Sequence, residues 1–272
     1  MGNPQIELVA PPETSAERPA QVRMVGVAKE YVSPSGARTR VLEDIDLTLH
    51  EGEFLSIVGP SGCGKSTILR LISGLAPITE GRIVVAGKEV TEPPKEVGFM
   101  FQKDTLLPWA SVSDNIAVAL ELNGTPPADR ASRIAELLEL LGLEGYGDYL
   151  PSQISGGMRQ RVALGRILAY GPEVYLMDEP FGALDAITKM AMGRELLRVW
   201  GKYGKSVVFV THDIEEAVGL SDRVLVMEGP PGRIKSEHRI DIERPRDLRQ
   251  VRMTPGFREH CEKIWFDIGQ KD

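Results

Sequence analysis

A glycine-rich segment, GPSGCGKST at residues 59–67, has the residue types and spacing of a phosphate-binding loop. It fits the pattern G-x-x-x-x-G-K-[ST] through Gly59, Gly64, Lys65 and Ser66. Glycines let successive backbone N–H groups turn inward around an anion, and a helix that starts there adds the positive end of its dipole. The lysine and the hydroxyl would reach the terminal phosphates and the Mg²⁺ ion of a nucleotide. A plain glycine-rich turn is the alternative, but an apolar strand before the loop and an apolar helix after it favour phosphate binding.

A second pair of glycines stands in ISGGMRQR, at residues 154–161, before a basic helical stretch. Ser155, Gly156 and Gly157 at a helix start have the means to hold a phosphate, although the same residues also suit a simple turn before a helix. The chain therefore contains two candidate phosphate-holding segments, which a single nucleotide site within one chain does not explain.

Polar side chains follow three short apolar runs, each read as a buried strand. Asp178 and Glu179 follow VYLM, His212 follows the run that begins VVFV, and Gln102 follows GFMF. Ligands of open α/β sheets lie at the carboxyl ends of the strands, so these side chains are expected to meet at one edge. A solvated acid, a structural histidine and an ordinary glutamine are the alternatives for Glu179, His212 and Gln102.

Each of these side chains has a specific chemical prediction beside the phosphate loop. Asp178 would hold Mg²⁺ through water, and Glu179 would polarise the attacking water. His212 would form a hydrogen bond with the γ-phosphate, and Gln102 would be a Mg²⁺ or water ligand. A pair of acids directly after four apolar residues is costly to bury unless it is used.

The elements that position these residues alternate between strands and helices. Short strand-like runs and turns extend from Val22 to about Val97, and a mostly helical stretch runs from after Gln102 to about residue 170. Its first helix is expected to begin at Ser113 or Asp114 as N-cap. Strands at 174–177 and 206–210, separated by a helix, then form a crossover unit. The pattern predicts an α/β core with a helical insert and a small C-terminal helical extension.

The composition is that of a soluble globular protein. The chain has 272 residues and a formal net charge of −7, which predicts no nucleic-acid partner because such surfaces are basic. Cys63 and Cys261 are widely separated and fit a reducing cytosol rather than a disulfide framework. No apolar run approaches the roughly 20 residues that span a bilayer. Residues 1–20 lack the features of a signal peptide and are predicted to form a mobile tail.

The ordered set GPSGCGKST, FQ, ISGGMRQR, VYLMDEP, FGALD and VTHD resembles the motifs of the ATPase subunits of ABC transporters, over residues 22–240. The resemblance implies a P-loop NTPase core with a mixed sheet and an antiparallel β subdomain, at 21–243. It implies a helical subdomain at about 103–170 and leaves 244–272 as a C-terminal helical extension. In this family two subunits pair head to tail, and each ATP lies between the phosphate loop of one and the signature segment of the other.

The resemblance assigns roles residue by residue. Ser155, Gly156, Gly157 and Met158 would contact the ATP that is bound by the partner subunit, and Asp185 would lie in the loop that joins the two sites. Catalysis would rest on Glu179, His212 and Gln102, and Mg²⁺ would be held by Ser66, Gln102 and Asp178. Tyr31 would stack on adenine, with an ordinary strand tyrosine as the alternative. The complete ATP-binding set is Tyr31, Gly59, Pro60, Ser61, Gly62, Cys63, Gly64, Lys65, Ser66 and Thr67.

Three positions depart from the family pattern. Ile154 stands in place of leucine, Met158 in place of glutamine and Gly182 in place of the serine of SALD. Activity is expected to survive, because Ser155 and the glycine amides would make the phosphate contact and Glu179 is intact.

The wider sequence is similar to the importer ATPases for nitrate, aliphatic sulfonates, taurine and related small solutes. Leu107, Pro108 and Trp109, with Leu106, are either core or the surface that receives a transmembrane permease. The implied partners are a second ATPase subunit, the permease and, indirectly, a solute-binding protein, at the cytoplasmic face of the inner membrane. A non-transport ABC ATPase and a regulatory nucleotide-binding subunit are the rival hypotheses, and the solute itself is left open.

Overall fold

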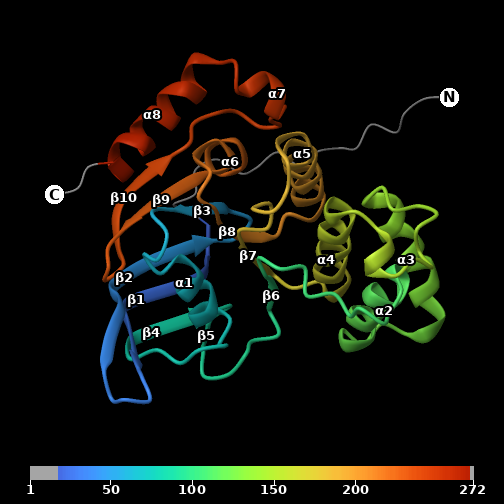
Figure 1. Cartoon of the computed structure of the whole chain (residues 1–272), viewed down its shortest axis with the longest axis horizontal. Helices are drawn as coiled ribbons and strands as arrows, with labels where there is room; N and C mark the ends of the chain where they lie inside the picture. The colour runs from blue at the N-terminus through green and yellow to red at the C-terminus, as the bar shows by residue number, and fades with distance from the viewer. Residues whose placement is uncertain (1–17, 270–272) are drawn as a thin grey trace.

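The structure, a computed structural model, describes residues 18–269, so most of the predicted tail at 1–20 lies outside the described residues. Two β-sheets and the helices that cover them make up the fold (Figure 1). A four-stranded antiparallel sheet has the order β2-β1-β4-β5. Its strands are β1 (Ala20–Val32), β2 (Arg38–His50), β4 (Glu80–Val85) and β5 (Lys88–Glu89).

The second sheet has six strands in the order β10-β9-β3-β8-β7-β6 and carries the candidate chemistry. Neighbouring strands from β9 to β6 run parallel, and only β10 pairs antiparallel with β9, so the sheet is mixed. The strands are β3 (Phe54–Val58), β6 (Val97–Met100), β7 (Val174–Asp178), β8 (Ser206–Val210), β9 (Arg223–Glu228) and β10 (Arg233–Arg239).

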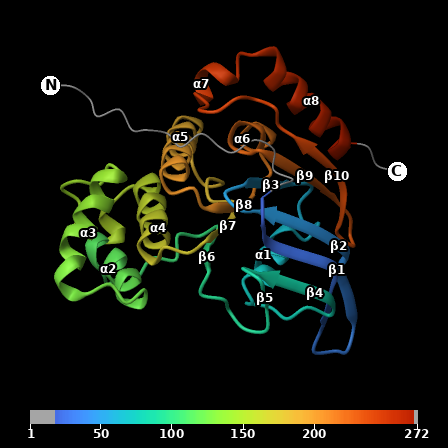
Figure 2. The ribbon, with the colours of Figure 1, turned by 180° about the vertical axis from the view of Figure 1, so that it is seen from behind.

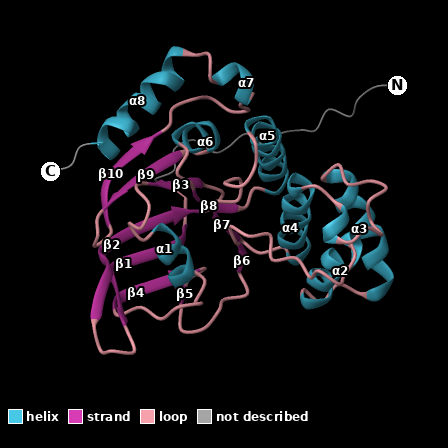
Figure 3. Cartoon of the chain, in the orientation of Figure 1, coloured by secondary structure: helices cyan, strands magenta, loops and turns pink. Residues whose placement is uncertain are grey.

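The helices occupy distinct places around the sheets, as Figure 3 shows by its colouring. They are α1 (Lys65–Ile72), α2 (Val112–Leu122), α3 (Pro127–Leu140), α4 (Gly156–Tyr170), α5 (Ala186–Tyr203), α6 (Ile214–Leu220), α7 (Leu248–Val251) and α8 (Pro255–Gly269), with a 3₁₀ turn at Pro151–Gln153. Helices α2, α3 and α4 lie together on one side of the molecule (Figures 1 and 2).

The central strands are buried on both faces, and alternate residues enter different cores. In β8, Val207 and Phe209 pack toward α4 and α5, whereas Val208 and Val210 pack toward α1 and the antiparallel sheet. This is the two-residue period of a strand, applied where both faces are covered by other elements. The continuous apolar runs in the sequence therefore mark strands that lie in the middle of the fold.

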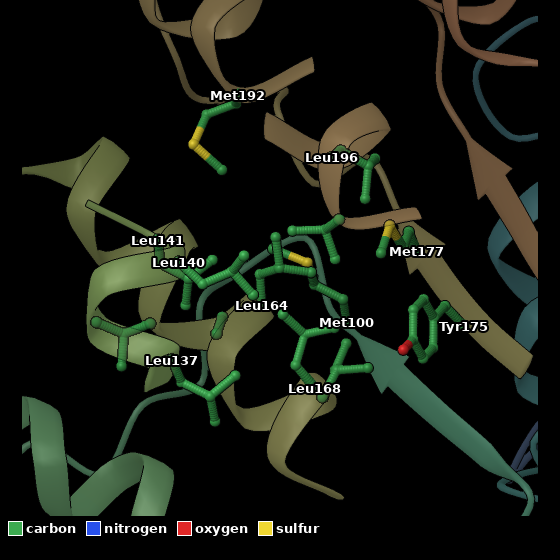
Figure 4. Close-up of a cluster of buried hydrophobic side chains, with 14 of the residues drawn as sticks. Met100, Leu137, Leu140, Leu141, Leu164, Leu168, Tyr175, Met177, Met192 and Leu196 are labelled. Carbon is green, nitrogen blue, oxygen red and sulfur yellow. The ribbon is translucent and has the colours of Figure 1, made fainter. Parts of the chain in front are cut away.

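One of these cores joins the helical side to the sheet. Tyr175 and Met177 of β7 pack against Leu164 and Leu168 of α4, and Leu137 of α3 extends the same cluster (Figure 4). The helices α2 to α4 thus share a core with the strands that carry Asp178, and their position is tied to the edge of the sheet where the polar residues lie.

Helix α2 begins two residues earlier than the sequence pattern predicts. Its N-cap is Ser111, whose Oγ accepts a hydrogen bond from the Asp114 amide at 3.0 Å, and Asp114 Oδ2 accepts one from the Ser111 amide at 3.3 Å. The prediction of Ser113 or Asp114 as N-cap is wrong, because Asp114 is the third residue of this reciprocal capping box.

Candidate active site

The phosphate loop joins β3 to α1, and its fixed glycines have structural reasons to be glycine. Gly59 has a φ of 151°, and a Cβ there would lie 2.5 Å from the Met227 carbonyl oxygen. Gly64 has a φ of 98°, and its Cβ would lie 2.5 Å from Leu42 Cδ2. Any side chain at either position would force the loop away from its supports. The loop therefore has little freedom, and its backbone amides are held for an anion.

Lys65 is folded back over this loop. Its Nζ donates to the carbonyl oxygens of Gly59 at 2.8 Å and Pro60 at 2.9 Å, and the residue is 6% exposed. The ammonium group is thereby kept at the mouth of the loop, where a bound phosphate would compete for its N–H groups. Burial raises the pKa of the Cys63 thiol, so this neighbour stays neutral and adds no charge against a phosphate.

Ser66 and Asp178 form the oxygen pair expected of a Mg²⁺ site. Ser66 Oγ donates to Asp178 Oδ1 at 2.8 Å, and Asp178 is 8% exposed at the end of β7. Burial raises the pKa of Asp178, and the Ser66 hydrogen bond opposes that rise. Within residues 18–269 no group of three or more His, Cys, Asp or Glu side chains gathers as a metal site. Mg²⁺ commonly uses one or two protein oxygens together with substrate phosphates and water, and Ser66 and Asp178 supply two oxygens that lie together.

Glu179 collects the other two predicted catalytic residues around one carboxylate oxygen. His212 Nδ1 lies 3.2 Å from Glu179 Oε2, and Gln102 Nε2 donates to the same oxygen at 3.4 Å. His212 and Gln102 are exposed, and Glu179 is half-buried. The structure thus brings together side chains from the ends of β6, β7 and β8, as the strand-end pattern predicts.

The Glu179 backbone has an unusual conformation, with a φ of 45°. Its amide donates to the Val210 carbonyl at 2.9 Å, and its own carbonyl accepts from the Gly182 amide at 3.1 Å. Positive φ is uncommon for residues other than glycine, and such strain persists where the surroundings hold it. The two hydrogen bonds fix the turn that directs the carboxylate toward His212.

The signature segment, residues 154–158, begins helix α4. Ser155 is the N-cap, and its Oγ accepts from the Met158 amide at 3.3 Å. Gly157 packs tightly against α5, since a Cβ there would lie 2.8 Å from Thr188 Cγ2. Ile154 is buried, whereas Ser155 is exposed. The hydroxyl hydrogen of Ser155 and the first amides of α4 are therefore left for an outside acceptor.

This segment does not reach the phosphate loop of its own chain. Helices α1 and α4 lie in different parts of the fold, and among residues 18–269 no hydrogen bond or ion pair joins the signature segment to residues 59–67 (Figures 1 and 2). The structure brings together the phosphate loop, Asp178, Glu179, His212 and Gln102, but not Ser155.

Asp185 and Tyr31 have local roles that sequence reasoning did not supply. Asp185 is the N-cap of α5: its Oδ1 accepts from the amides of Ile187 at 3.0 Å and Thr188 at 3.1 Å. The Thr188 hydroxyl is the largest cause of a lowered pKa of Asp185. Tyr31 is 40% exposed near the end of β1, and the Lys29 ammonium lies 4.7 Å from its ring centroid. One face of that ring is thus already in contact.

The apolar run after Gln102 divides between core and surface. Leu106 is 9% exposed and belongs to the large core, whereas Trp109 is 77% exposed. The backbone of Leu107 is held by Asn115, which accepts from its amide at 2.9 Å and donates to its carbonyl at 3.2 Å. A groove of about 220 Å³ lies between β6 and helices α2 and α4, and its lining includes Phe101, Leu122 and Arg166.

Comparisons with known proteins agree with this arrangement. The family profile described as ABC transporter matches residues 42–182. An uncharacterised ABC transporter ATP-binding protein of Methanocaldococcus jannaschii is 49% identical over 230 residues, covering 85% of each chain. A taurine import ATP-binding protein of Roseobacter denitrificans is 42% identical, over 88% of this chain and 90% of that protein. An aliphatic sulfonates import ATP-binding protein of Xanthomonas axonopodis pv. citri is 48% identical, over 78% and 88%.

Solved structures give the same answer for the fold. A dimeric ATP-binding cassette in a post-hydrolysis state, bound to ADP and Pi, has a TM-score of 0.72 and 31% identity, covering 82% of this chain and 100% of that one. A second dimeric cassette of a bacterial ABC transporter has a TM-score of 0.73 and 32% identity. The predicted fold class is confirmed. The chain therefore belongs to the ABC transporter family, as an ATP-binding subunit that hydrolyses ATP.

Proposed function

We propose that this chain energises the uptake of a small organic anion of the sulfonate type, or nitrate, through a separate membrane permease. The observation that carries the ATPase part is the meeting of Lys65, Ser66, Asp178 and Glu179 at the carboxyl edge of the six-stranded sheet. The names of the relatives support import and the solute class. No helix among residues 18–269 is long and apolar enough to cross a membrane, so the proposed path for the solute lies in the permease.

In the proposed reaction the chain binds ATP and positions water for attack on the γ-phosphate. Lys65 and the loop amides neutralise phosphate charge, and Ser66, Asp178 and the Gln102 amide oxygen would hold Mg²⁺. A Mg²⁺ ion held by these residues would supply positive charge that stabilises the phosphates during the reaction. Glu179 orients or deprotonates the water, because its carboxylate lies beyond the metal-binding pair at the open end of β7.

His212 has a defined part in this scheme. If its Nδ1–H is shared with Glu179, then Nε2 donates to a phosphate only when the ring is protonated. The histidine would then join the water-activating carboxylate to the γ-phosphate, and would stabilise charge in the transition state.

The second half of each ATP site is proposed to come from a second copy of the chain. The exposed Ser155 hydroxyl and the amides of Gly156 and Gly157 suit an anion, and among residues 18–269 no hydrogen bond joins them to the phosphate loop of the same chain. A head-to-tail homodimer would give each ATP one phosphate loop and one signature segment. Met158 takes the glutamine position with its amide already bound to Ser155. The proposed contact with the partner's ATP therefore does not require a polar side chain at Met158.

The groove between β6 and helices α2 and α4 is proposed as the permease-docking surface. Leu107, Pro108 and Trp109 lie within the helical subdomain at about 103–170, and an exposed tryptophan suits a protein interface. The segment begins just after Gln102, so a change at the γ-phosphate would reach this surface directly. The chain would lie at the cytoplasmic face of the membrane, and a solute-binding protein would act through the permease. No nucleic acid is needed.

Hydrolysis by the purified chain with its permease tests the proposal. Glu179→Gln should still bind ATP, lose at least about 100-fold in kcat, and accumulate as an ATP-bound dimer in gel filtration. Glu173→Gln is a matched control, because Glu173 is an exposed acid just before β7 whose carboxylate pairs with Lys205, away from the phosphate loop. Absence of Mg²⁺-dependent hydrolysis in the wild type, even with its permease, would refute the assignment.

A further inference from the structure

Both neighbours of His212 are tied to Glu216, Thr211 through the buried carboxylate and Asp213 through the backbone amide. The Thr211 hydroxyl donates to Glu216 Oε2 at 2.8 Å and accepts from the Asp213 amide at 3.0 Å. Asp213 Oδ1 in turn accepts from the Glu216 amide at 3.1 Å. Thr211 is 2% exposed and Glu216 is 9% exposed, whereas the His212 side chain is 55% exposed between them. The residues on either side of the exposed imidazole are therefore fixed through Glu216.

The second carboxylate oxygen of Glu216, Oε1, lies beside the ammonium group of Lys189. Among residues 18–269 no hydrogen bond of good geometry reaches Glu216 Oε1, and the Lys189 ammonium lies 3.2 Å from it. The same ammonium lies 3.8 Å from Asp213 Oδ2. Burial raises the pKa of Glu216, and the Thr211 hydrogen bond and Lys189 oppose that rise. A buried carboxylate without its cation would be strongly disfavoured, so Lys189 keeps Glu216 in place as an anion.

Lys189 also links Glu216 to the start of helix α5. It lies in the first turn of α5, where its amide donates to the Asp185 carbonyl at 2.8 Å. Asp185 caps the same helix, and α5 lies beside α6 in both views (Figures 1 and 2). A continuous series of contacts thus runs from Asp185 through Lys189, Glu216 and Thr211 to the backbone of His212.

We propose that Glu216 and Lys189 are positioning residues for His212, and that they couple its place to the start of α5. The inference rests on the proposed role of His212 in ATP hydrolysis. Neither residue contacts ATP in this scheme: both act by holding the 211–213 backbone, from which the imidazole reaches Glu179. A shift of about 1 Å in a catalytic group costs as much as 100-fold in rate, so the loss of this support is a catalytic effect.

The main experiment compares steady-state hydrolysis and ATP binding in the full chain with saturating Mg²⁺. Glu216→Gln and Lys189→Met should each lower kcat about 10-fold while the Kd for ATP stays within about twofold. Lys189→Arg keeps the cation and should retain kcat within about threefold. Lys205→Met is the matched control, because Lys205 also pairs with a glutamate, Glu173 at 2.8 Å, beyond the other end of α5. It should leave kcat unchanged.

A double-mutant cycle with His212→Ala shows whether the effect passes through the imidazole. In that background Glu216→Gln should change kcat by less than about twofold, since coupled residues are not additive. The His212 ring resonance, identified by its loss in His212→Ala, supplies a second measurement that needs no turnover. It should shift in Glu216→Gln and Lys189→Met, while the His50 resonance stays in place.

Each outcome has a distinct meaning. An unchanged kcat and ring resonance in Glu216→Gln and Lys189→Met would overturn the inference, as would an equal loss of rate with and without His212. If circular dichroism shows that Glu216→Gln does not fold, the comparison of Lys189→Met with Lys189→Arg tests the inference instead. Lys189 is partly exposed, so its replacement should disturb folding less. If His212→Ala hydrolyses ATP like the wild type, the proposed function of His212 fails instead.

Discussion

Ser66 and Asp178 are joined by a hydrogen bond of 2.8 Å although 112 positions separate them in the chain. The contact links the first turn of α1 to the end of β7, and so ties the phosphate loop to the strand that carries both acids. Asp178 is buried with a raised pKa, which is an unfavourable place for a carboxylate without a cation. The pair supplies two of the oxygens that would hold the Mg²⁺ ion of the proposed reaction.

Ser66→Ala should weaken the Mg²⁺-dependent part of ATP binding and leave the Mg²⁺-independent part unchanged. The variant loses the hydroxyl but keeps the loop amides and Lys65, so we expect the affinity for ATP with Mg²⁺ to fall about 10-fold. The affinity for ATP with a chelator should change by less than about twofold, because the loop amides are intact. Calorimetric titration under both conditions measures the difference. Ser73→Ala, which removes a hydroxyl bound to Arg70 at the end of α1, is the control. Equal losses with and without Mg²⁺ would contradict the metal assignment.

Ser155 allows the signature segment to be tested without unfolding α4. Asn and Asp are both good N-caps, so Ser155→Asn and Ser155→Asp keep the helix start at similar cost. Only Asp places a negative charge where a γ-phosphate is expected. We predict that Ser155→Asp loses at least about 10-fold more ATPase activity than Ser155→Asn, because like charges at close range repel. A similar activity for the two variants would show that no phosphate approaches Ser155.

Mixing inactive variants tests whether the signature segment acts on the partner. In a heterodimer of Lys65→Ala and Ser155→Asp subunits, a head-to-tail arrangement places both defects in one site and leaves the other intact. Activity should therefore reappear on mixing, to roughly a quarter of the wild-type sites, by the statistics of random pairing of symmetric subunits. If both halves of a site came from one chain, every heterodimer would be defective and mixing would restore nothing.

The sequence predicts which residues bind nucleotide and carry out the chemistry better than it predicts the contacts that hold those residues in place. Residues such as Gln102 and Glu179 lie next to strand ends, and the carboxyl ends of parallel strands share one edge, so a short local pattern determines where they meet. The strand signals predict an α/β core, and the family resemblance adds the mixed sheet and the antiparallel β subdomain. These features depend on residues that are adjacent in the chain.

The supports depend on contacts that no local pattern encodes. The N-cap of α2 is Ser111, not Ser113 or Asp114. Both serines of SVS suit an N-cap, but only Ser111 is followed three residues later by an acid, which completes the capping box. The Lys189 contact to Glu216 joins separate helices, and an acid in the first turn of α6 is ordinary in a sequence. Likewise, β10 is short of apolar residues and exposed on much of its length, so its pattern carries no strand signal.

The attachment of α8 should depend on pH. Asp267 on α8 accepts from the Ser236 hydroxyl at 2.5 Å and lies 2.8 Å from His238 Nε2 on β10. The Ser236 hydrogen bond, and then His238, lower the pKa of Asp267. A lowered carboxyl pKa contributes stability that is present above the unfolded value near 4 and is lost as the pH falls through the folded value.

Asp267→Asn therefore should lower the free energy of unfolding at pH 7 by about 1 kcal/mol, and by progressively less below pH 4. Urea unfolding at several pH values measures the two curves. Reactivity of Cys261, whose pKa burial raises to about 12, reports on α8 itself, because the thiol lies on that helix. A difference between variant and wild type that stays constant down to pH 3 would contradict the ionic account.

Trp109 and Trp265 form a matched pair for locating the permease. They are 77% and 72% exposed, but Trp109 lies in the segment between Gln102 and α2 whereas Trp265 lies on α8. Replacing an exposed tryptophan by alanine costs little core packing. A buried interface tryptophan, in contrast, contributes roughly 2 kcal/mol, or about 30-fold in affinity. We therefore expect Trp109→Ala to weaken recovery of the permease by about that factor while ATP binding by the free chain is unchanged. Trp265→Ala should recover the permease like the wild type. Equal recovery with Trp109→Ala and the wild type would exclude the exposed Trp109 segment as a docking surface, and a selective loss with Trp265→Ala would move the docking surface to the C-terminal helix.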